Sequence, residues 1–142
     1  MKRIVRSAIV ECDAMTFYLL VEAIEAYPEF LPWCAAAEMH KSTPGRSVAT
    51  LTLAVKGLRH SITTENTHVP GQSIDMRLAE GPFKHFTAAW RFTPLGPGAC
   101  KAEYSMEYEF SNSVVAAVLE PVFRRIADST VDAFTRRIPS AC

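Results

Sequence analysis

Residues 27–34 read Tyr-Pro-Glu-Phe-Leu-Pro-Trp-Cys, an apolar and aromatic stretch at a point where connections are ordinarily polar. Its two prolines lack a backbone N–H, so neither is expected inside a continuing helix or a central strand. Phe30, Leu31 and Trp33 are therefore large apolar groups on a stiff, irregular segment. We expect this segment to close one end of a hydrophobic core or to line the mouth of a cavity.

The composition is that of an ordinary globular chain. Its 142 residues are 49% hydrophobic and 21% charged, which suits a single domain over residues 1–142 with a sizeable core. Fifteen basic and fifteen acidic residues cancel, so net charge gives no support for a DNA-binding protein. The sequence has neither a signal-peptide pattern nor an apolar run of about 18 residues. We therefore expect a cytoplasmic bacterial protein without an integral membrane segment, at most peripheral to the membrane.

The first part of the chain predicts a short strand followed by a helix. The strand is expected over residues 3–10, and Asp13 is a suitable N-cap because its carboxylate can accept from free backbone N–H groups. Apolar residues at 17, 20, 21 and 24 then repeat with helical spacing. The helix should end before Pro28, and a further helical turn is expected over residues 29–31.

The middle of the chain predicts a run of strands separated by turn residues. Alternating or β-branched segments occur at 37–41, 47–55, 60–67, 74–79, 86–93 and 101–110. The last is the clearest, because Tyr104, Met106 and Tyr108 alternate with polar and acidic residues. Such alternation is typical of an antiparallel sheet with one buried and one solvated face.

The end of the chain changes to helical spacing, with apolar residues recurring from Val115 to Phe134 after the N-cap candidates Ser111, Asn112 and Ser113. Pro121 lies inside this pattern and should either kink the helix or begin a second one. The order is strand, helix, about six strands and a long helix. This order predicts an α+β fold, with a curved antiparallel sheet wrapped around the C-terminal helix.

Catalytic and metal-binding patterns are missing from the sequence. No nucleophile-elbow, phosphate-loop, dinucleotide or zinc-protease motif is present, and the four cysteines and four histidines are scattered. Glu107 and Glu109 share a strand face that could form an acid–base pair, but that face is the polar, solvated one. We therefore expect no catalytic residue, no metal site and no enzyme activity.

The inward apolar residues allow two interpretations. They could simply fill the core, which is the usual role of an aromatic stripe. Alternatively, a curved sheet with only one long helix across it leaves space for a ligand. The candidate lining residues are Phe30, Leu31, Trp33, Leu51, Leu53, Met76, Phe83, Phe86, Trp90, Tyr104, Met106, Tyr108, Phe123 and Ile126. Lys56 and Lys84 flank strand ends and are candidates to contact a polar head group. They could equally be ordinary cations at strand ends, with no ligand role.

Three separated segments resemble the coenzyme Q-binding protein and RatA toxin family of the START-like, polyketide cyclase superfamily. They are residues 27–34, the segment 80–84 with Trp90 and Phe92 after it, and residues 110–134. The resemblance implies the helix-grip fold, with six to seven antiparallel strands around the C-terminal helix and a hydrophobic cavity between them. It also implies a non-catalytic lipid-binding protein that holds ubiquinone or a similar quinone as ligand, with no cofactor, and supports respiration.

The same resemblance implies two alternatives. The RatA branch is described as a toxin that binds the large ribosomal subunit and blocks subunit association. Arg124 and Arg125 are the candidate ribosome contacts, whereas Arg136 and Arg137 also suit the negative end of the helix dipole. The third alternative is an enzyme of the polyketide cyclase type, which would need a general base inside the cavity.

Overall fold

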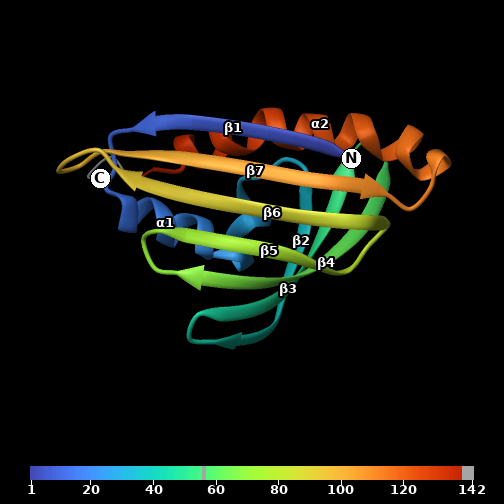
Figure 1. Cartoon of the computed structure of the whole chain (residues 1–142), viewed down its shortest axis with the longest axis horizontal. Helices are drawn as coiled ribbons and strands as arrows, with labels where there is room; N and C mark the ends of the chain where they lie inside the picture. Colours follow the sequence, from blue (N-terminus) through green and yellow to red (C-terminus); the bar gives the residue numbers. More distant parts are fainter. Residues whose placement is uncertain (56, 139–142) are drawn as a thin grey trace.

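A computed structural model describes residues 1–55 and 57–138 and contains one seven-stranded antiparallel sheet crossed by a long helix (Figure 1). The elements are β1 (Lys2–Val10), α1 (Ala14–Glu22), the 3₁₀ helix η1 (Ile24–Glu29), β2 (Cys34–Thr43), β3 (Arg46–Val55), β4 (Leu58–Val69), β5 (Ser73–Glu80), β6 (Phe83–Pro94), β7 (Cys100–Phe110) and α2 (Ser113–Arg136). This arrangement confirms the predicted α+β helix-grip fold.

The sheet is a meander of six strands, to which the first strand is added at one edge. Strands β2 to β7 pair consecutively, and β1 pairs antiparallel with β7, giving the order β1-β7-β6-β5-β4-β3-β2. All six predicted strand regions are present, although β2 is longer than expected. It extends over Cys34–Thr43 because two register shifts, at Cys34/Ala36 and Met39/Lys41, keep it paired with β3.

Both helices begin at the predicted cap residues. The Asp13 carboxylate accepts from the Thr16 backbone N–H at 2.9 Å, and Asn112 accepts from the Val115 backbone N–H at 2.9 Å. Each cap satisfies one of the free N–H groups in a first helical turn. Capping chemistry in the sequence therefore located the start of α1 at Asp13 and narrowed the start of α2 to three residues, of which Asn112 is the cap.

The prediction for residues 29–31 was wrong, because the helical turn forms earlier, as η1, and contains Pro28. The backbone N–H groups of Phe30 and Leu31 both donate to the Tyr27 carbonyl. In a single 3₁₀ turn, the N–H that proline lacks removes only one hydrogen bond. A short 3₁₀ helix therefore tolerates a proline that a continuing α-helix would exclude.

Pro121 does not start a second helix, because α2 runs through it from Ser113 to Arg136. The missing N–H of Pro121 would have reached the Ala117 carbonyl, four residues earlier. Both Ala117 and Pro121 are exposed, so water can satisfy that carbonyl. The proline therefore sits on the solvent side of the helix, where the lost bond costs least.

Two helices cover part of the sheet face that we call the inner face, the side carrying Phe86, Trp90 and Tyr104. Helix α2 lies along β1 and β7, and α1 lies against β6 and β7 (Figure 1). Leu51 and Met76, which point to the same face from β3 and β5, are only partly buried. The inner face is thus closely covered at β1, β6 and β7 and less covered around Leu51 and Met76.

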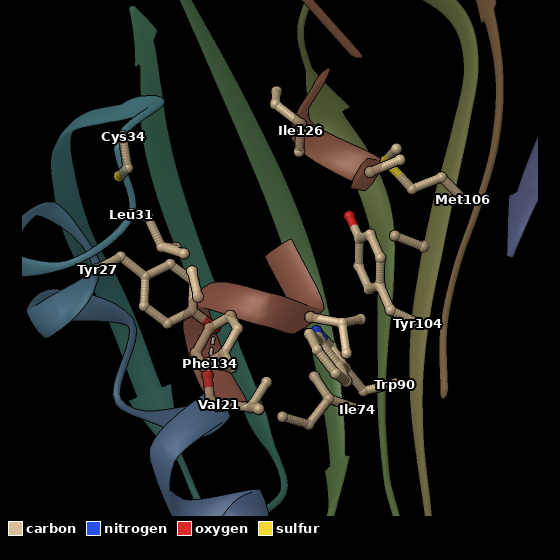
Figure 2. Close-up of a cluster of buried hydrophobic side chains, with 14 of the residues drawn as sticks. Val21, Tyr27, Leu31, Cys34, Ile74, Trp90, Tyr104, Met106, Ile126 and Phe134 are labelled. Carbon is tan, nitrogen blue, oxygen red and sulfur yellow. Dashed lines mark hydrogen bonds between the residues drawn. The ribbon is translucent and has the colours of Figure 1, made fainter. Parts of the chain in front are cut away.

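Aromatic rings fill the covered part. At the middle of α2, the Phe123 ring lies 5.2 Å from Phe83 and 5.5 Å from Tyr108, measured between centroids. Near its end, the Phe134 ring lies 5.4 Å from Trp90 and 5.2 Å from Tyr27. Figure 2 shows this second cluster, where η1 and α2 meet the sheet. These contacts join the Pro-rich connection directly to the core.

Candidate functional site

A groove of about 720 Å³ lies between the second half of α2 and the connection that joins η1 to β2. Its lining combines two proline rings, one phenylalanine and a set of charged residues. The lining residues are Phe30, Pro32, Pro121, Arg124, Arg125, Asp128, Ser129, Asp132, Ala133, Arg136 and Arg137. The groove therefore brings the apolar connection of residues 27–34 together with the arginines of the C-terminal helix.

Helical periodicity explains why the arginines collect on this side. Phe123, Ile126 and Phe134 point into the core and are almost fully buried. Arg124 and Arg125 lie between the buried residues Phe123 and Ile126 in the sequence, and both are exposed. Because an α-helix has 3.6 residues per turn, the buried residues fall on one side of the helix and the arginines on another. The second half of α2 is consequently apolar on one side and charged on the other.

The arginines of the groove make only loose ion pairs. Arg124 lies 3.6 Å from Glu120, Arg136 lies 4.0 Å from Asp132, and both arginine side chains are mostly exposed. Arg125 has no ion pair with any described residue. Exposed pairs of this kind contribute about 0–1 kcal/mol each, so an anionic partner can replace them at little cost. Four arginines against two aspartates give this groove a local positive excess on a neutral chain.

Arg137 is held differently, because its guanidinium lies over an aromatic ring. The guanidinium carbon is 4.8 Å from the centroid of Phe30, and the side chain also lies 3.7 Å from the Glu29 carboxylate. Phe30 itself packs edge-on against the Phe134 ring at 5.1 Å. A cation over a ring face at this distance is a stabilising cation–π contact. The η1 connection therefore fixes the position of one groove arginine.

Glu120 fastens the start of this face to the sheet. Its carboxylate accepts from the Tyr108 hydroxyl at 3.0 Å and lies 3.5 Å from the Lys2 ammonium, as well as beside Arg124. Burial of the phenol, together with the hydrogen bond to the Glu120 carboxylate, raises the pKa of Tyr108 above its usual value. One side chain thus links β1, β7 and α2 at the edge of the groove.

The predicted lining residues all belong to, or pack against, the buried core. Leu31 and Trp33 are fully covered rather than exposed, whereas Phe30 and Pro32 of the connection line the surface groove. The indole N–H of Trp33 is buried and makes no hydrogen bond with a described residue. Burial raises the pKa of the Tyr104 phenol well above its usual value. These residues are therefore placed as core residues, and a ligand role for them stays a prediction.

Of the two lysines predicted to contact a head group, only Lys84 is among the described residues. Lys56 lies outside the residues that the structure describes. Lys84 is exposed and lines a surface groove with Lys2 and the first turns of α2. Tyr108, one of the predicted lining residues, already donates its hydroxyl hydrogen to Glu120. A head-group role for the two lysines stays a prediction.

The described residues give little support for Glu107 and Glu109 as a catalytic acid–base pair. Glu107 is exposed on the outer face of β7, as is Glu109, which agrees with the solvated interpretation. In the same described part of the chain, no cluster of three or more histidine, cysteine, aspartate or glutamate residues is placed to hold a metal.

Sequence reasoning missed a polar cluster on β3 and β4. Ser47 Oγ lies 2.8 Å from His68 Nε2 and accepts from the Asn66 amide at 3.2 Å, with Ser47 and Asn66 buried. Desolvation lowers the pKa of His68, and the Glu22 carboxylate opposes that shift. Alternation of Thr64, Asn66 and His68 was the available signal, because these residues share one strand face.

The matched family and relatives agree with this architecture. Residues 10–135 match the family model described as polyketide cyclase/dehydrase and lipid transport. The chain belongs to this family. Its fold also matches the Zhui aromatase/cyclase of a Streptomyces species, with a TM-score of 0.85, 18% identity, and coverage of 99% of this chain and 97% of the other.

Two groups of curated relatives indicate which branch of the family the chain belongs to. The chain is 38% identical over 137 residues to the ribosome association toxin RatA of Escherichia coli, covering 96% of this chain and 87% of the relative. It is 22% identical over 124 residues to a mitochondrial coenzyme Q-binding protein homologue of Xenopus laevis, covering 84% of this chain and 51% of the relative. The chain thus belongs to the RatA and coenzyme Q-binding group predicted from three separated segments of the sequence, and the RatA likeness is the stronger. Of the helices described, none combines the length and apolar character needed to span a membrane.

Proposed function

We propose that this protein associates with the ribosome in the manner of RatA, and that the α2 groove contacts the large subunit. The observation that carries the proposal is the convergence of Arg124, Arg125 and Arg136 with the Phe30 connection in a single groove. The 38% identity to RatA supports this assignment over the quinone-binding one, for which the relative is 22% identical.

A local cluster of arginines is enough for a protein of zero net charge to bind RNA. Binding to a phosphate backbone depends on the number of phosphates neutralised, and not on the total charge of the protein. The groove offers four guanidinium groups, and each ion pair that they make with a described residue is weak and exposed. Arginine can also bind phosphate in bidentate fashion, which fixes orientation as well as affinity. A neutral chain can therefore still bind ribosomal RNA at one face.

Cosedimentation with purified large subunits tests the proposal. The wild type is expected to move with the subunit at low salt, and the charge-reversed variant Arg124→Glu/Arg125→Glu is expected to stay at the top of the gradient. Lys41→Glu/Arg46→Glu is the matched control, because it makes the same charge change at exposed strand residues away from α2. Failure of the wild type to cosediment at low salt, or equal loss in both variants, would contradict the proposal.

A hydrophobic ligand is a second candidate role, favoured by the partly covered inner face at β3 and β5. Leu51 and Met76 are apolar, point inward and are incompletely buried. An isoprenoid tail placed there would gain about 0.8 kcal/mol for each CH₂ removed from water. Ubiquinone or a related quinone is the ligand that the coenzyme Q-binding relative suggests.

Extraction with organic solvent and mass spectrometry tests this second role. Protein purified without detergent from a quinone-producing host is expected to yield quinone at close to one molecule per chain. A matched variant, Met76→Glu, should lose the ligand while an outer-face change, Thr87→Glu, should keep it. If the wild-type extract contains no quinone and the protein does not bind added quinone, the ligand role is contradicted and the ribosomal role stands.

A further inference from the structure

Arg137 and Phe30 form a stacked pair at one end of the groove. The guanidinium carbon of Arg137 lies 4.8 Å from the Phe30 ring centroid, so one face of the guanidinium is covered by the ring. Arg137 is exposed, and Tyr27 and Phe134 pack edge-on against the Phe30 ring. We call this pair, an arginine held over a packed ring at the surface, the platform.

The rest of the groove supplies positive charge next to that platform. Arg124, Arg125 and Arg136 line the same groove and are exposed. Arg125 has no ion pair with a described residue, and the pair of Arg136 with Asp132 is at 4.0 Å. Proteins that bind unpaired nucleic acid combine these same two components, a charged track for the backbone and flat groups on which bases stack.

We propose that the groove binds an unpaired stretch of RNA, with one base stacked on the Arg137–Phe30 platform and the adjoining phosphates against Arg124 and Arg125. This inference rests on the proposed ribosomal function and names its ligand as a single-stranded or bulged segment instead of a duplex. A duplex keeps its bases paired and stacked, so it would offer phosphates to the arginines but no base to the platform.

Substitution of arginine by lysine distinguishes stacking from charge. Lysine keeps the positive charge but has no planar group, so Arg137→Lys should remove the platform and leave the electrostatics intact. Arg124→Lys should cost less, about twofold, because a phosphate contact needs mainly charge. Phe30→Leu keeps the apolar volume of the connection and removes only the ring. Arg46→Lys, outside the groove, is the neutral control.

The probe is a fluorescein-labelled, unstructured 12-nucleotide RNA, compared by anisotropy with the duplex of the same sequence. The wild type should bind the single strand more tightly than the duplex. Arg137→Lys and Phe30→Leu should each weaken single-strand binding by about tenfold, the loss expected for one stacked base, and Arg137→Lys should do so without a change in melting temperature. The same variants should weaken cosedimentation with the large subunit.

The outcomes separate this inference from the function on which it rests. Equal affinity for strand and duplex, or equal effects of Arg137→Lys and Arg124→Lys, would overturn the stacked-nucleotide inference. Cosedimentation that survives both Arg137→Lys and Phe30→Leu would also overturn it and would indicate a ribosomal protein as the contact, while the proposed function stands. Loss of wild-type cosedimentation itself would instead remove the proposed function.

Discussion

The two sides of α2 differ in almost every physical respect. The inward side carries Phe123 and Phe134, which are nearly fully buried and held by aromatic contacts at 5.1–5.6 Å. The outward side carries exposed arginines with loose ion pairs of 3.6–4.0 Å. Stability is therefore concentrated on one side of the helix and partner chemistry on the other. Substitutions on the two sides should produce separable effects.

The largest effect is expected from the inward side. Phe123→Ala removes a ring that contacts Phe83, Phe86, Tyr108 and Phe110, so the free energy of unfolding should fall by about 3–5 kcal/mol. Urea denaturation measures this loss. The control Val118→Ala, at an exposed position of the same helix, should change stability by less than about 0.5 kcal/mol. Equal losses in both variants would show that the two sides do not differ as described.

A smaller effect is expected where the two sides meet, at the bond from Tyr108 to Glu120. Tyr108→Phe removes a hydrogen bond to a carboxylate and should cost about 1–2 kcal/mol in the free energy of unfolding. Tyr104→Phe is the matched control, because no described residue bonds the Tyr104 hydroxyl, and it should be close to neutral. A larger cost for Tyr104→Phe than for Tyr108→Phe in chemical denaturation would contradict the described bonding.

The contrast between the sides was only half visible in the sequence. Periodicity from Val115 to Phe134 identified the buried stripe, and Asp13 and Asn112 located the helix starts. The sequence could also show that Arg124 and Arg125 follow buried positions. It could not show that Phe30 and Pro32, about a hundred residues earlier, form the opposite wall of the groove, because that neighbourhood depends on how η1 packs against α2.

The chain connection itself was predicted less well than the elements. Its apolar character predicted either closure of one end of the core or a cavity mouth, and the burial of Leu31 and Trp33 agrees with the first alternative. The 3₁₀ helix that contains Pro28 redirects the chain so that these side chains point inward, while Phe30 and Pro32 reach the groove. Local turn geometry of this kind depends on hydrogen bonds to Tyr27 that no residue pattern specifies.

A third prediction concerns the buried polar cluster, which adds a pH dependence to the interior. Desolvation lowers the pKa of His68 below 6.5, so the unfolded chain binds the proton more readily than the folded one. Stability should therefore fall as the pH drops below about 6.5, by at most about 1.4 kcal/mol per pH unit. Thermal melts from pH 7 to pH 5 should show a flatter profile for His68→Gln. An unchanged profile would contradict the shift, and the exposed His40→Gln is the control.

The smallest effect is a chemical one inside the core. Burial raises the pKa of the Cys34 thiol to about 11, so at pH 8 only about a thousandth of it is thiolate. Iodoacetamide should therefore modify Cys34 very slowly in the folded protein and rapidly in urea, as read by mass spectrometry of its peptide. Rapid modification of the folded protein would show that the end of the core beside Leu31 is open.

The salt dependence of affinity for the large ribosomal subunit tests the central claim most directly. If the arginine side of α2 binds phosphates, affinity should fall steeply with salt, and Arg124→Gln/Arg125→Gln should reduce the slope of log K against log salt by about 1–2. Lys41→Gln/Arg46→Gln should leave the slope unchanged. A wild-type affinity independent of salt, or the same slope in both double variants, would contradict the assignment of this side of α2 to the ribosome.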